Sequence, residues 1–420
     1  MESTQPKVTD GLLRALQQAP SDQHISVIVR YSASRRMMRH REHIAGVRES
    51  YQYRLRPFMH VRATPEAIER LALDPDVVRI YEDVPVRAFL DTALPHVGVP
   101  LLWDQGLTGE GVAIAIVDTG LDAEHPDFAG RVADMADFSG EGLGDAHGHG
   151  THCAGIAAGS GAASGGRYRG VAPKATLYSA KVLRANGEGM MSDVIAGVEW
   201  AVEKGVQVIS LSLGSTGPSD GRDPLSETCD AAVERGIVVV VAAGNDGPAP
   251  RTIGSPGASR LALTIGACDD QDRVASFSSR GPTADGRPKP DLVVPGVNII
   301  APRAKGTAMG RVIDDYYTSA QGTSMATPLA AGVVALLRQA YPSLTPQGIR
   351  DRLLSSALDL GDGPYVQGYG RLDAWRAYQS EPSPKPVEPP QPPPSSGPAL
   401  GEGCLTALLQ MFFSGKGRTR

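Results

Sequence analysis

The chain has 420 residues, 41% of them hydrophobic, and a formal net charge of −5. This length predicts two or three structural parts, and the apolar share is typical of a globular protein with a large core. The mild acidic balance argues against nucleic acid as the main partner, and no apolar run reaches the roughly 20 residues of a membrane-spanning helix.

The cysteines and the first residues suggest a cellular location. Cys153, Cys229, Cys268 and Cys404 are widely spaced and form no CxxC pair. We therefore expect reduced thiols rather than a disulfide framework or a zinc ribbon. Residues 1–20 lack the basic start and apolar run of a secretory signal. We expect a cytoplasmic protein, or one exported by a non-classical route.

Residues 1–89 are predicted to form a small α+β domain. A helix is expected over 64–73, because Thr64 can cap it and Pro65 suits its first turn. Runs that alternate or carry β-branched residues predict three strands, at 24–31, 57–62 and 77–81.

From Gly111 onward, continuous apolar runs appear, and each of them ends in a turn. The runs are VAIAIVDTG, VQVISLSLG, IVVVVAAGN and LALTIGA. Strands that are apolar on both faces are typical of parallel sheets buried between helices, and helical patterns such as 192–204 alternate with the runs. We therefore predict an α/β domain with a doubly wound, mostly parallel sheet over residues 90–380.

The composition changes again after this domain. Residues 381–403 are rich in proline and predict an extended linker. Residues 404–420 form a short tail that is first apolar and then basic. Its apolar part, CLTALLQMFF, is either a docking helix or a loosely ordered end, and the sequence leaves both open.

Four polar residues stand where predicted strands and helices meet. Asp118 ends the strand VAIAIVD, and Asn245 ends IVVVVAAGN. His149 precedes the small-residue run THCAGIAAG, and Ser324 begins a long helical pattern. Because reactive groups gather at the carboxyl edge of an open parallel sheet, these residues are expected to converge.

Each of these residue types has a task in acyl transfer by a serine. A serine hydroxyl needs an imidazole to take its proton, and a carboxylate fixes the tautomer of that imidazole. A helix N-terminus and an asparagine amide both favour a developing oxyanion. Each residue alone could be a simple cap or turn residue, but the four together indicate a catalytic site.

Four motifs resemble those of the subtilase family, and more narrowly its intracellular, long-propeptide bacterial branch. They are IVDTGLD at 116–122, HGTHCAG at 149–155, AAGND at 242–246 and GTSMATP at 322–328, in the order Asp, His, Ser. The likeness covers roughly residues 95–378.

The resemblance implies a serine endopeptidase of broad specificity that works through an acyl-enzyme and needs no cofactor for its chemistry. In this family Asp118 would orient the base His149, and Ser324 would attack. Asn245 and the Ser324 backbone N–H would bind the oxyanion. The partners implied are protein and peptide substrates and the chain's own propeptide.

The resemblance also implies how substrate is held. The peptide would lie as an extra strand between two segments, Ser212-Leu213-Gly214 and Gly187-Glu188-Gly189, and the residue before the cut would enter a pocket lined by Ala243, Gly244 and Gly254. Small residues there leave room for a large apolar or aromatic side chain. Glu188 either favours basic residues two to four places before the cut or is an exposed loop acid.

The stretch VRIYEDVPVRAF at 78–89 resembles the end of subtilase propeptides. Residues 1–89 would then assist folding, inhibit the enzyme, and be removed by self-cleavage after Phe89, with Leu90 as the nearest alternative. A permanent regulatory domain is the competing interpretation.

Subtilases commonly bind calcium as a structural ion, and Asp127 and Asp291 match family ligand positions. The loop GSGAASGGRYRG, however, lacks the family's asparagine-bearing turn.

Two other functions are compatible with parts of the sequence. His147, His149 and His152 spell H-x-H-x-x-H, a pattern of zinc hydrolases, although Thr151 stands where the metallo-β-lactamase pattern has an aspartate. The cleft could also belong to a catalytically silent peptide-binding protein.

Overall fold

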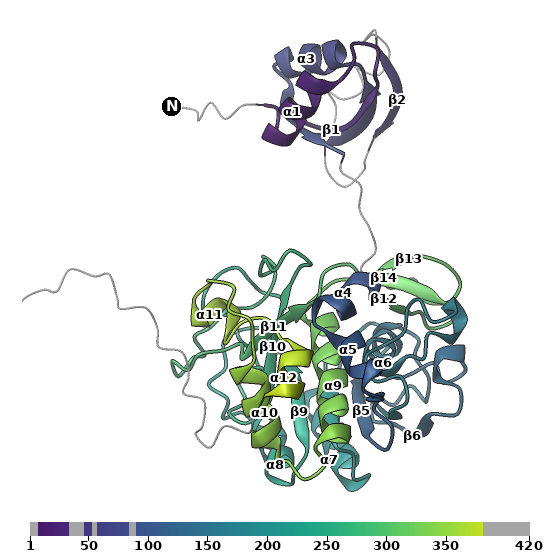
Figure 1. Ribbon diagram of the computed structural model, residues 1–420, viewed down its shortest axis with the longest axis vertical. Helices are drawn as coiled ribbons and strands as arrows, with labels where there is room; N and C mark the ends of the chain where they lie inside the picture. Colours follow the sequence, from purple (N-terminus) through teal and green to yellow (C-terminus); the bar gives the residue numbers. More distant parts are fainter. Residues whose placement is uncertain (1–6, 33–45, 53–56, 84–89, 381–420) are drawn as a thin grey trace, which may run out of the picture. The chain divides into compact units, whose positions relative to one another are not determined.

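The computed structural model describes residues 7–32, 46–52, 57–83 and 90–380 (Figure 1). The chain divides into two compact units, Met1–Arg87 and Ala88–Arg420. The predicted cut at Phe89, the linker 381–403 and the tail 404–420 lie outside the described residues. Within the described part, no helix combines the length and the apolar character needed to cross a bilayer.

In its described residues, the first unit is an antiparallel four-stranded sheet with two helices. The strand order is β2-β3-β1-β4, and the elements are α1 (Asp10–Gln18), β1 (Ile25–Tyr31), β2 (Val47–Gln52), β3 (Phe58–Ala63), α3 (Pro65–Leu73) and β4 (Val77–Glu82). The three strands and the helix expected from the sequence are present. Thr64 caps α3, because its hydroxyl accepts a hydrogen bond from Ala67 N at 3.4 Å. Helix α1 and strand β2 were not predicted.

The second unit is built on a seven-stranded sheet in the order β11-β10-β9-β8-β5-β7-β6, in which every pairing is parallel. The strands are β5 (Ala113–Asp118), β6 (Val132–Asp137), β7 (Thr176–Lys181), β8 (Val208–Leu211), β9 (Val238–Ala242), β10 (Leu263–Cys268) and β11 (Leu292–Pro295). A small antiparallel sheet joins β12 (Ile299–Pro302), β13 (Arg311–Val312) and β14 (Tyr317–Ala320).

Helices cover both faces of this sheet. Ile114 and Ile116 of β5 pack on one face with α6 (His149–Ala158) and α9 (Thr323–Ala340). Ala115 and Val117 face the other side, with α7 (Met191–Glu203) and α8 (Pro224–Glu234). The remaining helices are α4 (Leu90–His96), α5 (Val99–Asp104), α10 (Pro346–Ser355), α11 (Pro364–Gln367) and α12 (Ala374–Gln379), with short 3-10 turns η1 (Pro126–Phe128) and η2 (Ala162–Ser164). The predicted doubly wound α/β fold is confirmed.

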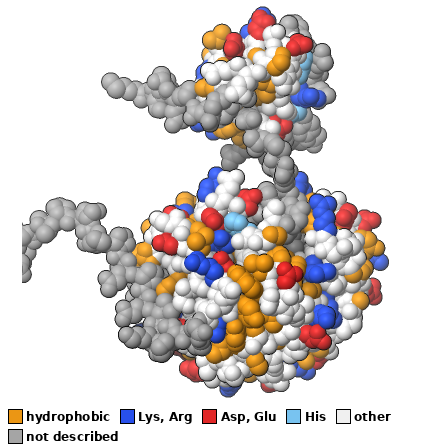
Figure 2. All heavy atoms as spheres, in the orientation of Figure 1, with side chains coloured by type: hydrophobic (Ala, Val, Ile, Leu, Met, Phe, Trp, Pro, Cys, Tyr) orange, Lys and Arg blue, Asp and Glu red, His pale blue; other side chains and the backbone are white. Residues whose placement is uncertain are grey.

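The strand order places a crevice beside β5. After β5 the chain adds β6 and β7 on one side, and then crosses to add β8 to β11 on the other. At such a reversal the carboxyl ends of neighbouring strands open onto a ligand site. The visible surface carries intermixed Lys, Arg, Asp and Glu side chains, with a band of hydrophobic side chains over the face where α9 and α12 lie (Figure 2).

Candidate active site

Asp118 is the last residue of β5, and it is almost fully buried, with 1% of its surface exposed. One of its carboxylate oxygens, Oδ1, accepts hydrogen bonds from Thr119 N and from His149 Nδ1, each at 2.7 Å. The carboxylate therefore holds the imidazole with its Nδ1 protonated, and it leaves Nε2 as the nitrogen that can take a proton.

The N-terminus of α6 positions His149, and Asp145 organises that turn. Asp145 Oδ1 accepts from Gly148 N at 2.7 Å and from Thr119 Oγ1 at 2.9 Å, while its Oδ2 accepts from Thr151 N at 2.9 Å. This single carboxylate links the end of β5 to the start of α6. Our sequence reasoning missed Asp145, although an acidic residue just before a helix start was the available signal.

Burial and nearby groups act on the pKa of His149 in opposite directions. Burial is the strongest single influence and disfavours the charged imidazolium, but the Asp118 carboxylate and Cys153 together raise the pKa of His149 well above its ordinary 6.5. His152, three positions later in the same motif, behaves in the opposite way. Burial, and then the nearby His149, lower the pKa of His152 to about 3.

Ser324 is the second residue of α9 and faces the end of β8. Its hydroxyl donates to the Ser212 carbonyl at 3.0 Å, and the Ser212 hydroxyl donates to the Ser324 carbonyl at the same distance. Cys153 lies behind both catalytic candidates, because its Sγ is 3.4 Å from the Ser324 carbonyl oxygen and 3.8 Å from His149 Nδ1. Burial raises the pKa of the Cys153 thiol.

Asn245 follows β9 and is anchored on the start of α9. Its Oδ1 accepts from Thr323 N at 2.9 Å and from Thr323 Oγ1 at 3.0 Å. Because a backbone N–H can only donate, the amide oxygen must face Thr323, and both N–H bonds of Nδ2 remain for another acceptor. Thr323 was not among the predicted site residues, and no sequence signal identifies it.

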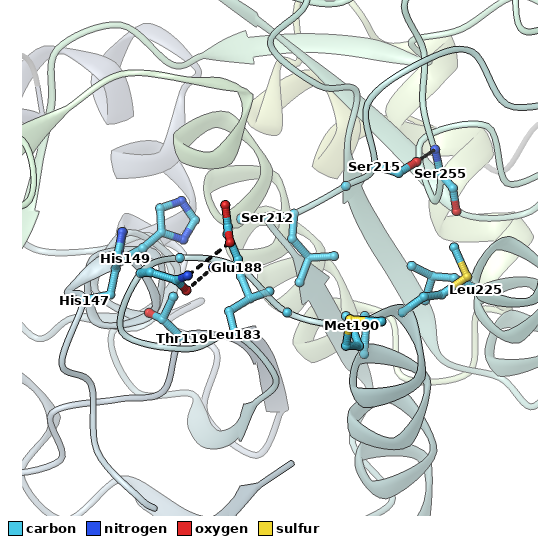
Figure 3. Close-up of a pocket in the computed structure, with 17 residues that line it drawn as sticks. Thr119, His147, His149, Leu183, Glu188, Met190, Ser212, Ser215, Leu225 and Ser255 are labelled. Atoms are coloured by element: carbon cyan, nitrogen blue, oxygen red, sulfur yellow. Dashed lines mark hydrogen bonds between the residues drawn. The ribbon is translucent and has the colours of Figure 1, made fainter. Parts of the chain in front are cut away.

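Two adjoining cavities form a continuous cleft along these residues. They have volumes of about 620 and 210 Å³ and share Ser212 to Ser215 and Ser255. Figure 3 shows His149 and Glu188 toward one end of the larger cavity, and Leu225 and Ser255 toward the other. All the residues predicted to hold substrate line the two cavities: Gly187, Glu188, Gly189, Ser212, Leu213, Gly214, Ala243, Gly244 and Gly254.

Two details of the cleft bear on what it can accept. A Cβ at Gly254 would lie 2.1 Å from the Ser215 carbonyl oxygen, so the wall of the smaller cavity requires glycine. Glu188 is exposed, and its carboxylate accepts from Asn186 Nδ2 at 3.1 Å. The cleft therefore combines a small-residue pocket with an acidic rim.

Comparison with known proteins assigns the chain to a family. Residues 109–371 match the model of the subtilase family. The chain belongs to the subtilase family. It is 41% identical to serine protease AprX of Bacillus subtilis over 340 residues, which are 74% of this chain and 76% of the relative. It is 40% identical to subtilisin DY of Bacillus licheniformis over 291 residues, 67% and 98% of the two chains.

A third relative, the M-protease of Shouchella clausii, is 38% identical over 329 residues, which are 77% of this chain and 80% of the relative. Family membership and these serine proteases identify this subtilase as a serine endopeptidase, a hydrolase. Enzymes of this family need no cofactor for their chemistry.

The histidine pattern of a zinc hydrolase does not come together in this subtilase. Among the described residues, the only group whose ligand atoms lie within 4.8 Å of one another is Asp118, His149 and Cys153. Nε2 of His152 instead lies 3.2 Å from the Thr318 carbonyl oxygen. His147 packs edge-on against His149, with ring centroids 6.1 Å apart.

The two carboxylates considered as calcium ligands lie outside the cleft and do not fit that ion. Asp127 accepts from Ala163 N at 3.0 Å and from the Tyr317 hydroxyl at 3.0 Å. Asp291 pairs with Lys289 and Arg350 at 2.7 and 2.6 Å. Calcium requires six to eight oxygen ligands, and both carboxylates instead face hydrogen-bond donors of the chain.

Proposed function

We propose that this subtilase hydrolyses peptide bonds through Asp118, His149 and Ser324. The observation that supports this most strongly is the 2.7 Å hydrogen bond from the His149 imidazole to a buried Asp118 carboxylate, beside a serine at the start of α9. Such an imidazole is oriented to take a proton at Nε2, and the buried carboxylate stabilises the cation that results.

In the proposed reaction, Ser324 Oγ attacks the peptide carbonyl while His149 takes the hydroxyl proton. The oxyanion receives hydrogen bonds from Asn245 Nδ2 and from the Ser324 backbone N–H. The C–N bond then breaks as His149 returns the proton to the leaving amine, which gives an acyl-enzyme. Water, deprotonated by the same imidazole, hydrolyses the ester and restores Ser324.

Substrate binding prepares the nucleophile in this scheme. In the free enzyme the Ser324 hydroxyl donates to the Ser212 carbonyl, and the same carbonyl belongs to the segment proposed to pair with a substrate strand. A peptide N–H that donates to Ser212 competes with the hydroxyl. The hydroxyl is then released toward His149, so that activation follows binding.

The proposed specificity is broad, with a preference for a large apolar or aromatic residue before the cut. Ala243, Gly244 and Gly254 support this preference, because their small side chains leave the 210 Å³ cavity open beside Ser324. Backbone pairing makes recognition tolerant of the remaining sequence. The exposed Glu188 carboxylate would add a preference for basic residues further upstream.

We further propose that residues 1–89 form an inhibitory propeptide and that the enzyme removes it by cutting after Phe89. The first unit has a hydrophobic core of its own, with Leu12, Val27, Ile68 and Ile80 fully buried. A part with its own core can fold, inhibit and then be released. We propose a cytoplasmic or non-classically exported enzyme.

The test is to purify the wild type and Ser324→Ala, and to measure the mass, peptide hydrolysis and fluorophosphonate labelling of each. We expect the wild type to lose residues 1–89 and to label once, and Ser324→Ala to stay intact and unlabelled. Ser192→Ala, which changes an exposed serine in the first turn of α7, is the matched control and should behave as wild type.

Three results would contradict these proposals. Self-processing or peptide hydrolysis by Ser324→Ala would remove Ser324 as the nucleophile. An active enzyme whose N-terminus lies far from Leu90 would refute the cut site. A wild type that binds peptides without cleaving them would instead indicate a silent peptide-binding protein.

A further inference from the structure

Asp127 sits in a buried polar cluster that is complete without a metal ion. It is fully buried. Its Oδ1 accepts from Ala163 N at 3.0 Å, and the Tyr317 hydroxyl lies 3.0 Å from its Oδ2. A cation placed against this carboxylate would face the positive ends of these donors. Within the described residues, Asp127 belongs to no group of His, Cys, Asp or Glu that could share an ion.

The guanidinium of Arg131 links three segments of the chain, as a bound structural cation would. Arg131 donates to the carbonyl oxygens of Ala158 at 2.7 Å, of Ala175 at 3.2 Å, and of Asp127. These oxygens belong to the end of α6, the segment before β7, and η1. Gathering carbonyl oxygens from separate segments is a typical role of calcium. An arginine does so with a permanent charge and a planar set of donors.

Asp291 shows the same arrangement on the other side of the unit. Lys289 Nζ donates to Asp291 Oδ2 at 2.7 Å and to the Ala262 carbonyl at 3.0 Å. Arg350, from α10, donates to Asp291 Oδ1 at 2.6 Å, and Thr264 N donates to Oδ2 at 2.7 Å. Two protein cations therefore already neutralise this carboxylate, and a divalent ion would be repelled by both.

We propose that this subtilase supplies its structural cations from its own chain, through Arg131 at Asp127 and through Lys289 and Arg350 at Asp291. Its folded state then neither binds calcium at these positions nor depends on it. This departs from what the family resemblance implies. It is independent of the proposed catalytic mechanism, because none of these side chains lines the cleft.

The first test compares unfolding temperatures of the full chain in excess chelator and in millimolar calcium, with magnesium as the ionic control. Ser324→Ala is used in order to prevent self-digestion. We expect the midpoints to agree within about 1 °C. An ion bound at 100 times its Kd would raise the midpoint by roughly 5 °C or more. A rise of that size with calcium but not magnesium would overturn the proposal.

The second test removes the internal cation. Arg131→Met keeps the aliphatic stem but removes the guanidinium donor of the Ala158 and Ala175 carbonyls, while the Asp127 carbonyl keeps Ser160 N at 3.1 Å. We expect the midpoint to fall by roughly 5 to 15 °C in both media. The matched control is Arg273→Met, whose side chain is 70% exposed and pairs with Asp269 on the surface. It should change the midpoint by no more than about 2 °C.

If Arg131→Met does not fold, Tyr317→Phe gives an independent measurement. This change removes only the hydroxyl that faces Asp127, and we expect a smaller fall of the midpoint, equal with and without calcium. A wild-type midpoint in Arg131→Met, or restoration of the Tyr317→Phe midpoint to wild-type level by calcium but not by magnesium, would show that the internal groups do not carry this structural role.

Discussion

Replacing Asp118 by asparagine tests how the buried carboxylate controls His149. Both Thr119 N and His149 Nδ1 donate to the same oxygen, Oδ1. An asparagine must therefore keep its oxygen at that place and put its NH₂ group where Oδ2 was, a buried position for which the structure gives no hydrogen-bond partner. The contact to His149 can survive in this variant, while the negative charge is lost.

One magnitude follows from this geometry, and a second is taken from related enzymes. Unsatisfied buried amide donors cost about 1–3 kcal/mol of folding stability. The rate should fall on the order of 10⁴-fold, which corresponds to about 5.5 kcal/mol in the activation free energy. The size of the rate loss is known from serine proteases themselves, subtilisin included, where the orienting aspartate was changed.

The decisive measurement is kcat/KM of a peptide substrate as a function of pH. His149 acts as a base only when neutral, so activity rises with pH through its pKa. That pKa is raised above 6.5 in the wild type, because Asp118, aided by Cys153, more than offsets burial. In Asp118→Asn burial remains and the charge is gone. The acidic limb of the residual activity should therefore move from above to below pH 6.5.

The control is Asp104→Asn, an exposed carboxylate at the end of α5, which should leave the profile unchanged. An acidic limb that stays in place in Asp118→Asn would refute the claim that this carboxylate sets the pKa of His149. A nearly normal rate in that variant would remove Asp118 from the mechanism.

Three further predictions concern the cleft. Asn245→Ala should lower kcat by roughly 100- to 1000-fold with little change in KM, a magnitude known from subtilisin itself, and near-normal turnover would exclude the residue from the oxyanion hole. Mercurials should inhibit the enzyme partially through Cys153, and full activity after complete modification of that thiol would contradict this. Glu188→Gln should lose any preference for basic residues two to four places before the cut, as measured with a peptide library, and an unchanged preference would dismiss the proposed role of its charge.

The parts of the fold and the site that could be predicted are those indicated by local sequence patterns. The apolar runs that end at Asp118 and Asn245 are strands β5 and β9, and the cap at Thr64 was readable from its own sequence. These features depend on residues near one another in the chain. Strand β2, with the sequence VRESYQ, was missed because it has little β-branched or alternating character, and its pairing with β3 stabilises it instead.

Contacts between distant residues explain what the sequence did not reveal. The Tyr317 hydroxyl and Asp127 are 190 positions apart, and Asn245 reaches Thr323 across 78. No pattern within one segment indicates such pairs. Arg131 is similar, because its role depends on carbonyl groups whose positions are fixed only when α6 and β7 are packed.

The protonation state of His149 bears on the direction in which the Ser324 hydroxyl donates. While His149 is protonated, its Nε2 has no lone pair to accept the serine hydroxyl, and the raised pKa of His149 widens the pH range in which that form is present. The hydroxyl then turns to the best acceptor within reach, which is the Ser212 carbonyl at 3.0 Å. Higher pH frees the acceptor on His149, and a bound peptide strand occupies Ser212. Both changes direct the same hydroxyl toward His149, so alkaline conditions and substrate should reinforce each other in activating this subtilase.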